Sequence, residues 1–240
     1  MLISKLLKRI RIFMKRLDAF LSSLGYCSRS EARLFLRLNT VLVKNERVFN
    51  PSTKVNHCDV LINSEPLDAE KLVIILNKPS GYICSHNDAG KLIYSLLPLR
   101  YQNRNPKIST IGRLDIDTTG AILLTDDGEL NHKLTSPKKD VKKIYEVTLQ
   151  NPLKGDEKEL FFSGEVILNG EDKPLKPAFL KQINSNLVHL EIVEGKYHQV
   201  KRMFAYTGNK VIKLHRLEFA GFRVDDLKDG EFKILENDKI

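Results

Sequence analysis

The carboxylates of residues 112–128 (GRLDIDTTGAILLTDDG) are the side chains best arranged for chemistry in this chain. Asp115 follows Arg113 by two positions, and Asp117 lies two residues further on. The glycines of this segment predict tight turns that present a charged loop next to an apolar strand at 121–124. Charged loops on rigid scaffolds often carry function, and a carboxylate can act as a nucleophile or as a base.

The same segment also permits a calcium-binding interpretation. Part of an EF-hand loop is matched by Asp115, Asp117, Thr119, Gly120 and Asp126. The match is imperfect, because the last ligand is Asp rather than Glu and an apolar strand follows where a helix is required. A phosphate-binding loop is disfavoured, because the chain has neither a G-x-G-x-x-G nor a Walker sequence. A third alternative makes the two aspartates solvated carboxylates of a turn.

Residues 112–128 resemble the catalytic motif of RNA pseudouridine synthases, in particular the RsuA-type branch that acts on bacterial small-subunit rRNA. The matching sequences are GRLDIDTTG and LLTDDGEL. A second stretch, EGKYHQVKRMFAYTGN at 194–209, matches the same family and follows at the family's spacing. The resemblance implies isomerisation of uridine to pseudouridine, with Asp115 as the essential carboxylate.

The resemblance also implies roles for further residues of the active site. Lys201 would pair with Asp115 and keep it ionised, although many relatives have Arg at this position and lysine lacks bidentate geometry. Arg202 is the second choice for this pairing. Tyr145 would stack on the uracil, and Arg113 would fill the space left when the target base is flipped out of the RNA.

Two polar residues close to this set are not expected to transfer protons. Asp117 would project away from Asp115 if the stretch between them is extended, and would hold its own loop. His198 is expected to be structural or to contact RNA. Binding of RNA phosphates is the alternative role of Lys201 and Arg202. No cofactor and no metal are expected, since the isomerisation includes neither a redox step nor a group donor.

The charge balance of the chain favours a polyanionic partner. The 240 residues include 39 Lys and Arg against 30 Asp and Glu, which gives a formal net charge of +9. Each contact between a cation and a phosphate releases condensed counterions. With 42% hydrophobic residues, the chain is long enough for one large or two modest domains with sizeable cores. A merely basic protein has the same composition, so charge alone identifies no partner.

The cysteines and the first residues bear on the compartment. Cys27, Cys58 and Cys84 are odd in number and widely spaced, which predicts neither a disulfide framework nor a zinc site and fits a reducing cytoplasm. Residues 1–13 are a basic extension whose Lys and Arg interrupt every apolar run, so they form neither a signal peptide nor a membrane span. We expect this extension to be dispensable, with Met14 as an alternative start; a basic amphipathic anchor is the other interpretation.

Residues 14–66 are predicted to form a small RNA-binding domain. Apolar residues have helical spacing over 16–24, a second helix is predicted over 29–38, and a hairpin over 41–48. The unit resembles an S4 domain, in which two helices and a small sheet bind structured RNA. Arg16, at the start of the first helix, is a candidate for contact with RNA.

The second predicted helix carries the most conspicuous cationic pattern of this domain. Ser28 and Glu31 form a capping box at its start. Arg29, Arg33 and Arg37 lie four residues apart and would form one stripe along the helix. Because like charges at this spacing repel one another, we expect the stripe to bind phosphates. An ordinary solvated helix face is the alternative.

The rest of the chain is predicted to form the catalytic domain. Residues 67–71 are read as a linker and 72–240 as the pseudouridine synthase domain. The expected elements are strands over 72–76, 82–84, 121–124, 144–149, 186–193 and 210–219, and a basic helix over 195–206. Because strands outnumber helices and no β-α-β rhythm is present, the fold class is predicted as α+β, with a mixed and mainly antiparallel sheet.

These motifs together predict a cofactor-independent rRNA pseudouridine synthase. The expected partner is small-subunit (16S) rRNA or a ribosomal assembly intermediate, and the protein is expected to be a cytoplasmic monomer that does not bind membranes. A sister enzyme acting on large-subunit (23S) rRNA is one alternative. A non-catalytic S4-type RNA-binding or ribosome-assembly factor is the other, and intact Asp115 and Tyr145 argue against it.

Overall fold

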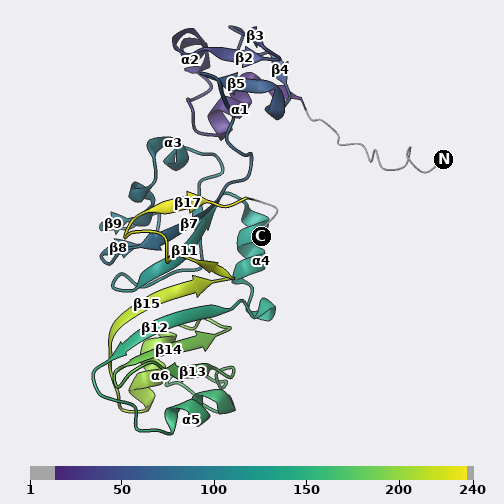
Figure 1. Cartoon of the computed structure of the whole chain (residues 1–240). Coiled ribbons are helices and arrows are strands. Elements are labelled where there is room, and N and C mark those ends of the chain that lie inside the picture. Colours follow the sequence, from purple (N-terminus) through teal and green to yellow (C-terminus); the bar gives the residue numbers. More distant parts are fainter. Residues whose placement is uncertain (1–13, 237–240) are drawn as a thin grey trace, which may run out of the picture. The chain divides into compact units, whose positions relative to one another are not determined.

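The computed structural model describes residues 14–236, so the predicted extension at 1–13 lies outside the described residues (Figure 1). The chain forms two compact units. Over residues 14–236, the first comprises 14–70 and 98–107, and the second comprises 71–97 and 108–236. Within the described residues, no helix has the length and apolar character needed to cross a bilayer.

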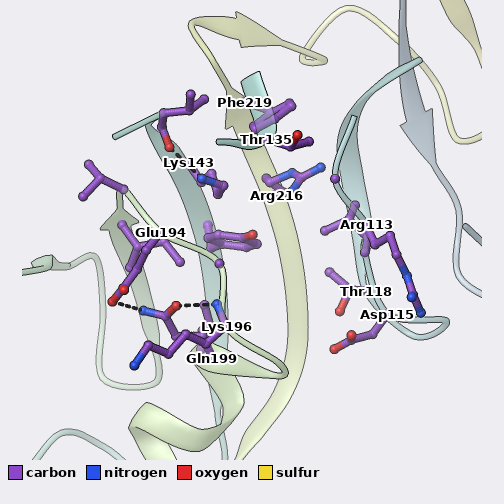
Figure 2. A pocket seen from close by; sticks show the side chains of 18 of the residues that line it. Arg113, Asp115, Thr118, Thr135, Lys143, Glu194, Lys196, Gln199, Arg216 and Phe219 are labelled. Atoms are coloured by element: carbon purple, nitrogen blue, oxygen red, sulfur yellow. Dashed lines mark hydrogen bonds between the residues drawn. The ribbon is translucent and has the colours of Figure 1, made fainter. Parts of the chain in front are cut away.

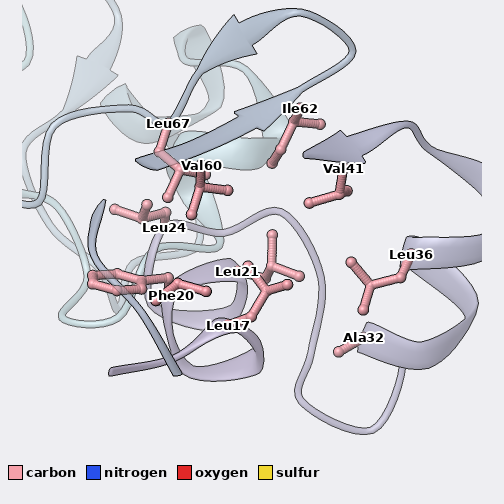
Figure 3. Close-up of a cluster of buried hydrophobic side chains, with 11 residues drawn as sticks. Leu17, Phe20, Leu21, Leu24, Ala32, Leu36, Val41, Val60, Ile62 and Leu67 are labelled. Carbon is pink, nitrogen blue, oxygen red and sulfur yellow. The ribbon is translucent and has the colours of Figure 1, made fainter. Parts of the chain in front are cut away.

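The first unit packs two short helices and small antiparallel strands around one apolar core (Figure 3). Its four-stranded sheet has the order β3-β2-β5-β6, and a separate pair joins β1 to β4. The elements are β1 (Lys15–Arg16), α1 (Leu17–Ser23), α2 (Ala32–Leu38), β2 (Val41–Val43), β3 (Glu46–Arg47), β4 (Lys54–Val55), η2 (His57–Asp59), β5 (Val60–Ile62) and β6 (Glu65–Pro66). Leu17 and Leu21 of α1 and Leu36 of α2 are fully buried in this core.

Local sequence accounts for the helix start and the hairpin of this unit. Ser28 N donates to Glu31 Oε2 at 2.9 Å and Glu31 N donates to Ser28 Oγ at 3.3 Å, which is the predicted capping box. The helix that follows begins at Ala32, three residues later than predicted. Between β2 and β3, Lys44 and Asn45 have φ of 52° and 68°, as a tight two-residue hairpin turn requires.

Residues 98–107 pack with the first unit, although sequence analysis assigned them to the catalytic domain. This segment contains α3 (Leu99–Gln102). Arg100 Nε lies 3.0 Å from Asp68 Oδ2, and buried Arg104 donates to the carbonyl of Ala69 at 2.7 Å. The interpretation of 67–71 as a linker is therefore wrong for residues 67–70, since arginines that are distant in sequence hold them in place.

The second unit is built on a nine-stranded sheet in the described residues, with helices beside it (Figure 1). The strand order is β13-β14-β12-β15-β11-β7-β17, with β10 paired to β11 and β16 paired to β15. The strands are β7 (Val73–Lys78), β10 (Ser109–Ile111), β11 (Thr119–Thr125), β12 (Lys143–Leu149), β13 (Phe179–Gln182), β14 (Leu187–Ile192), β15 (Val211–Phe219), β16 (Phe222–Arg223) and β17 (Phe232–Ile234). Only β11 and β15 pair in parallel among these strands, so the prediction of an α+β fold with a mixed, mainly antiparallel sheet is confirmed.

Shorter elements complete this unit. They are β8 (Tyr82–Ile83), β9 (Lys91–Leu92), η3 (Ile93–Leu96), α4 (Gly128–Thr135), η4 (Pro137–Lys139), α5 (Glu157–Ser163) and α6 (Gln199–Tyr206). The predicted strands are present. Strands with a continuous apolar run are buried on both faces of the sheet, and strands with an alternating pattern are buried on one face. The basic helix predicted from residue 195 begins only at Gln199.

The parallel pairing of β11 with β15, single among the described strands of the nine-stranded sheet, fixes the chain at the centre of that sheet. Thr119 is in register with His215, and Gly120 is in register with Arg216. Gly120 has φ of 103°, and a Cβ atom at this position would collide with the backbone of Arg216. Only glycine tolerates this φ together with so close an approach. The loop over 112–118 therefore ends at a defined point beside β15.

Candidate active site

The loop over 112–118 borders a cavity of about 220 Å³ in the second unit. Figure 2 shows Arg113, Asp115 and Thr118 on one side of it, opposite Glu194 and Gln199. The remaining walls come from the end of α4 and the residues after it, from β12 and from β15: Leu134, Thr135, Ser136, Pro137, Val141, Lys143, Tyr145, Leu214, Arg216 and Phe219. Two sequence segments that lie far apart, the acidic loop and the start of α6, thus meet at one cavity.

Asp115 is held between two side chains from the region of α6. Lys201 Nζ donates to Asp115 Oδ2 at 3.0 Å, and His198 Nε2 lies 3.4 Å from Asp115 Oδ1. Lys201 Nζ also donates to Asp117 Oδ1 at 2.7 Å. Of the two cations considered from sequence, Lys201 is therefore the one that contacts the Asp115 carboxylate.

The two aspartates do not point away from each other. The expectation of opposite directions assumed extended chain, but Thr118 N donates to the carbonyl of Asp115 at 3.2 Å and closes a turn. Partial burial opposes the charge on Lys201, but hydrogen bonds to Asp117 and Asp115 outweigh it and raise the pKa of Lys201. The same ammonium lowers the pKa of Asp117. The Lys201 ammonium thus binds both carboxylates.

Arg202, the second choice for this pairing, points elsewhere. Its NH1 lies 3.1 Å from Glu171 Oε1 and donates to the carbonyl of Tyr197 at 3.1 Å. Its NH2 donates to the carbonyl of Asn169. Three of the five guanidinium N–H donors are thus engaged within the protein, and the binding of RNA by Arg202 stays a prediction.

The residues before α6 form a loop that is braced on several sides. Lys196 N donates to Gln199 Oε1 at 2.9 Å, and Gln199 Nε2 donates to Glu194 Oε1 at 3.0 Å (Figure 2). Lys196 Nζ pairs with Glu171 Oε2 at 3.1 Å. His198 closes the loop with φ of 48°. This bracing explains why the helix starts four residues later than its sequence pattern predicted.

An aromatic and cationic cluster lines the cavity along β12 and β15. Tyr145 is 7% exposed, and the guanidinium carbon of buried Arg216 lies 6.0 Å from its ring centre and 4.6 Å from that of Phe219. Arg216 Nε donates to the carbonyl of Ala121 at 2.6 Å. Its NH2 has no hydrogen-bond partner among the described residues. Tyr145, predicted from sequence, therefore lies at the cavity, whereas the part played by Arg216 was not predicted.

Lys143 lies in the same cavity, two residues before Tyr145. Its Nζ donates to the carbonyl of Val141 at 2.7 Å. Burial, followed by the neighbouring charge of Arg216, lowers the pKa of Lys143 to about 8. This amine therefore changes charge close to neutral pH. Sequence analysis assigned no role to Lys143, because desolvation depends on tertiary packing.

A buried lysine, Lys78, binds backbone carbonyls of the loop that carries Asp115. Lys78, at the end of β7, is fully buried, and its Nζ donates to the carbonyls of Thr118 at 2.8 Å, Asp115 at 3.1 Å, Pro79 at 3.2 Å and Ile116 at 3.3 Å. Burial lowers the pKa of Lys78. Sequence analysis did not predict this role. One sequence feature could have predicted it: Lys78 ends an otherwise apolar strand, and an ammonium that is buried with such a strand needs several hydrogen-bond acceptors.

The predicted arginine stripe of the first unit is only partly present. Arg29 precedes α2, and both Arg29 and Arg16 pair with buried Asp18, at 3.4 Å and 2.7 Å. Arg33 and Arg37 do lie on α2, are exposed, and form no ion pair within the described residues. The prediction of three arginines along one helix is therefore wrong for Arg29, which the late helix start leaves outside.

The calcium-binding alternative does not fit the geometry of the loop. The residues after the two aspartates form strand β11 rather than a helix. Asp126, which would supply the last ligand, accepts a hydrogen bond from Leu72 N at 2.7 Å. No group of three or more His, Cys, Asp or Glu side chains in residues 14–236 is arranged to hold a metal ion.

Comparison with known proteins assigns both parts of the chain to families. The family described as RNA pseudouridylate synthase matches residues 72–206, and the family described as S4 domain matches residues 15–61. Both ranges coincide with the regions that carried the sequence motifs.

Full-length relatives are similar over nearly the whole chain. A protein of Escherichia coli (strain K12) named ribosomal small subunit pseudouridine synthase A is 42% identical over 94% of this chain and 98% of its own length. A protein of the same name from Pasteurella multocida (strain Pm70) is 40% identical over 94% and 97%. A solved structure titled crystal structure of pseudouridylate synthase has a TM-score of 0.65, with 39% identity over 93% of this chain and 97% of its own.

Proposed function

Because this chain belongs to the RNA pseudouridylate synthase family, we propose that it isomerises one uridine of bacterial small-subunit rRNA to pseudouridine. The names of its full-length relatives support this substrate, since sequence identity of 40% and 42% extends over 94% of the chain and includes the S4 domain. The reaction breaks the N-glycosidic bond, turns the base, and joins C5 to the ribose. No electron or group donor enters it, so we propose that the protein acts without a cofactor.

The observation that carries this proposal is the position of Asp115 at the cavity, with its carboxylate bound to Lys201 Nζ at 3.0 Å. In the proposed mechanism, Asp115 acts on the target nucleotide as nucleophile or base. Lys201 holds this carboxylate in place by a direct charge-assisted hydrogen bond. His198, on the other oxygen, orients the carboxylate.

Two further residues are proposed to hold the flipped nucleotide. Tyr145 lines the cavity with its ring and would stack on the uracil. Arg113 lies on the loop beside Asp115 and would occupy the space that the base leaves in the RNA. A uridine that remains stacked in RNA cannot reach a cavity of this kind, so both contacts are needed before the chemistry begins.

The S4 unit is proposed to bind rRNA and thereby present the target to the catalytic unit. Its exposed cations Arg33 and Arg37 are the best candidates for phosphate contacts, and the formal charge of +9 favours such a partner. We also propose that the protein works in the cytoplasm on rRNA or on an assembly intermediate. The S4 unit would then bind the rRNA, and the second unit would carry out the reaction.

Mapping of pseudouridines in rRNA tests the proposed function. A strain that lacks the protein should lose one pseudouridine from small-subunit rRNA, and a plasmid encoding the wild type should restore it. A plasmid encoding Asp115→Asn should not. Loss of a site in large-subunit rRNA would instead identify the sister activity, and an unchanged set of pseudouridines would favour a non-catalytic factor.

A further inference from the structure

Tyr197 is an exposed aromatic residue at the edge of the candidate active site. Its side chain is 76% exposed, and its ring stacks on that of His198 with centroids 3.8 Å apart and an angle of 19° between the planes. His198 Nε2 in turn lies 3.4 Å from Asp115 Oδ1. The exposed ring is therefore separated from the Asp115 carboxylate by one imidazole only.

The backbone that carries Tyr197 is held rigidly. Its carbonyl accepts a hydrogen bond from Arg202 NH1 at 3.1 Å, and Glu171 fixes the same guanidinium at 3.1 Å. On the preceding residue, Lys196 N is bound to Gln199 Oε1. A braced loop that leaves a large ring in solvent resembles a preorganised contact surface, because little conformational entropy remains to be lost when a ligand binds.

We propose that Tyr197 stacks on the base of a nucleotide next to the target uridine, and so positions the RNA strand at the active site. This inference rests on the proposed function. Flipping the uridine breaks its stacking with both neighbours and leaves their base faces open. One face of the Tyr197 ring is covered by His198, and a neighbouring base would cover the other. Aromatic side chains bind single-stranded RNA in this way with little sequence preference.

Tyr206 offers a matched comparison, at the far end of the helix that follows the Tyr197 loop. It lies at the end of α6, is 56% exposed, and borders a different hollow together with Lys154 and Thr207. Single exposed aromatic residues are common on protein surfaces, so exposure alone assigns no role. Tyr197 differs from Tyr206 in its stack on His198 and its place beside Asp115.

Steady-state kinetics on the full chain provide the first test, with tritium release from [5-³H]uridine in a transcript of small-subunit rRNA. Tyr197→Leu should raise KM about tenfold, since a stacked base contributes roughly 5- to 150-fold in binding, and should leave kcat within about threefold. Tyr197→Phe keeps the ring and should remain within about twofold of the wild type in KM. Tyr206→Leu should change neither constant.

Fluorescence provides a second test that does not depend on turnover. The chain contains no tryptophan, so Tyr197→Trp introduces a single reporter, and Tyr206→Trp is its control. Binding of the transcript should quench the emission of the Tyr197→Trp variant strongly, as stacking on a base does, and that of the Tyr206→Trp variant only weakly.

The two proposals fail in different ways. Absence of tritium release by the wild-type protein, both from the free transcript and from an assembly intermediate that contains it, would overturn the proposed function. Release by the wild type together with an unchanged KM for Tyr197→Leu would overturn the stacking inference alone. Equal quenching at both tryptophan positions, or none with bound RNA, would also overturn it.

Discussion

Lys78 Nζ lies 2.8 Å from the carbonyl oxygen of Thr118, so a buried ammonium at the end of β7 holds the loop that carries Asp115. The same group reaches three more carbonyls, including that of Asp115 itself. The position of the Asp115 carboxylate therefore depends on the buried Lys78, which binds the carbonyls of this loop. Removal of its ammonium leaves several buried acceptors without a donor, which is costly.

Lys78→Met should destabilise the protein by about 2–4 kcal/mol and abolish most activity, because the acidic loop loses its support. Urea denaturation and tritium release measure the two effects. Lys91→Met, on an exposed lysine of β9, is the control and should be neutral. An unchanged unfolding midpoint for Lys78→Met would mean that the carbonyls find other donors.

Asp115→Asn should reduce pseudouridine formation below detection, while RNA affinity stays within about tenfold of the wild type, or roughly 1.4 kcal/mol. The amide keeps the size of the side chain and loses its charge. Asp117→Asn should reduce pseudouridine formation much less, since Asp117 only shares the Lys201 ammonium with Asp115 and its side chain is 64% exposed. Tritium release together with filter binding separates the two effects, and robust release by Asp115→Asn would identify a different catalytic residue.

Lys201→Met should lower kcat by about 100-fold, because the Asp115 carboxylate loses the ammonium that binds it at 3.0 Å and fixes its position. Lys201→Arg should recover much of this loss, since charge is kept. Arg202→Met is the neighbouring comparison and should act through stability, because Arg202 braces Glu171 and the carbonyl of Tyr197. If Arg202→Met lowers kcat as much as Lys201→Met without a change in stability, the assignment of Lys201 fails.

Joint substitution of Arg33→Gln and Arg37→Gln should weaken rRNA binding through the loss of two phosphate contacts. The slope of the logarithm of the binding constant against the logarithm of the salt concentration should become shallower by about one to two. The control changes the same amount of charge on the other unit, with Lys158→Gln and Lys181→Gln. The affinity for rRNA, measured over a range of salt concentrations, distinguishes the two double variants. Equal slopes for both double variants would make α2 an ordinary solvated face.

Lys143 should make stability depend on pH above neutrality. Its pKa is about 8 in the folded protein and about 10.4 in an unfolded chain, so between these values the unfolded state binds more protons. The free energy of unfolding should therefore rise with pH in this window, by about 1–3 kcal/mol relative to Lys143→Met. Urea denaturation of both proteins from pH 7.5 to 10 in the same buffers, about the range of this titration, measures the difference. A constant difference across this range would contradict the lowered pKa.

Sequence reasoning was sufficient where local pattern determines structure. The alternation in 144–149 predicted β12, the apolar run at 121–124 predicted β11, and Ser28 with Glu31 predicted the capping box. The identity of the Asp115 loop and its partner Lys201 followed from motifs, since residue type and order survive in sequence.

Features that depend on distant contacts could not be predicted in this way. The role of Lys78 depends on three carbonyls, those of Asp115, Ile116 and Thr118, which the turn after Asp115 brings to it. The lowered pKa of Lys143 depends on burial beside Arg216. The assignment of Arg202 required knowledge of Glu171, which lies on another segment. Local sequence does not specify the partners in such pairings.

The inclusion of residues 98–107 in the first unit has a consequence for how the protein is made. A ribosome delivers the chain from its N-terminus, so residues 14–70 emerge well before their last partners. Asn105 N donates to the carbonyl of Ser23, and Gly25 lacks the Cβ that would collide with the carbonyl of Arg100. The RNA-binding part can therefore complete its packing only after β7 of the catalytic sheet has been translated.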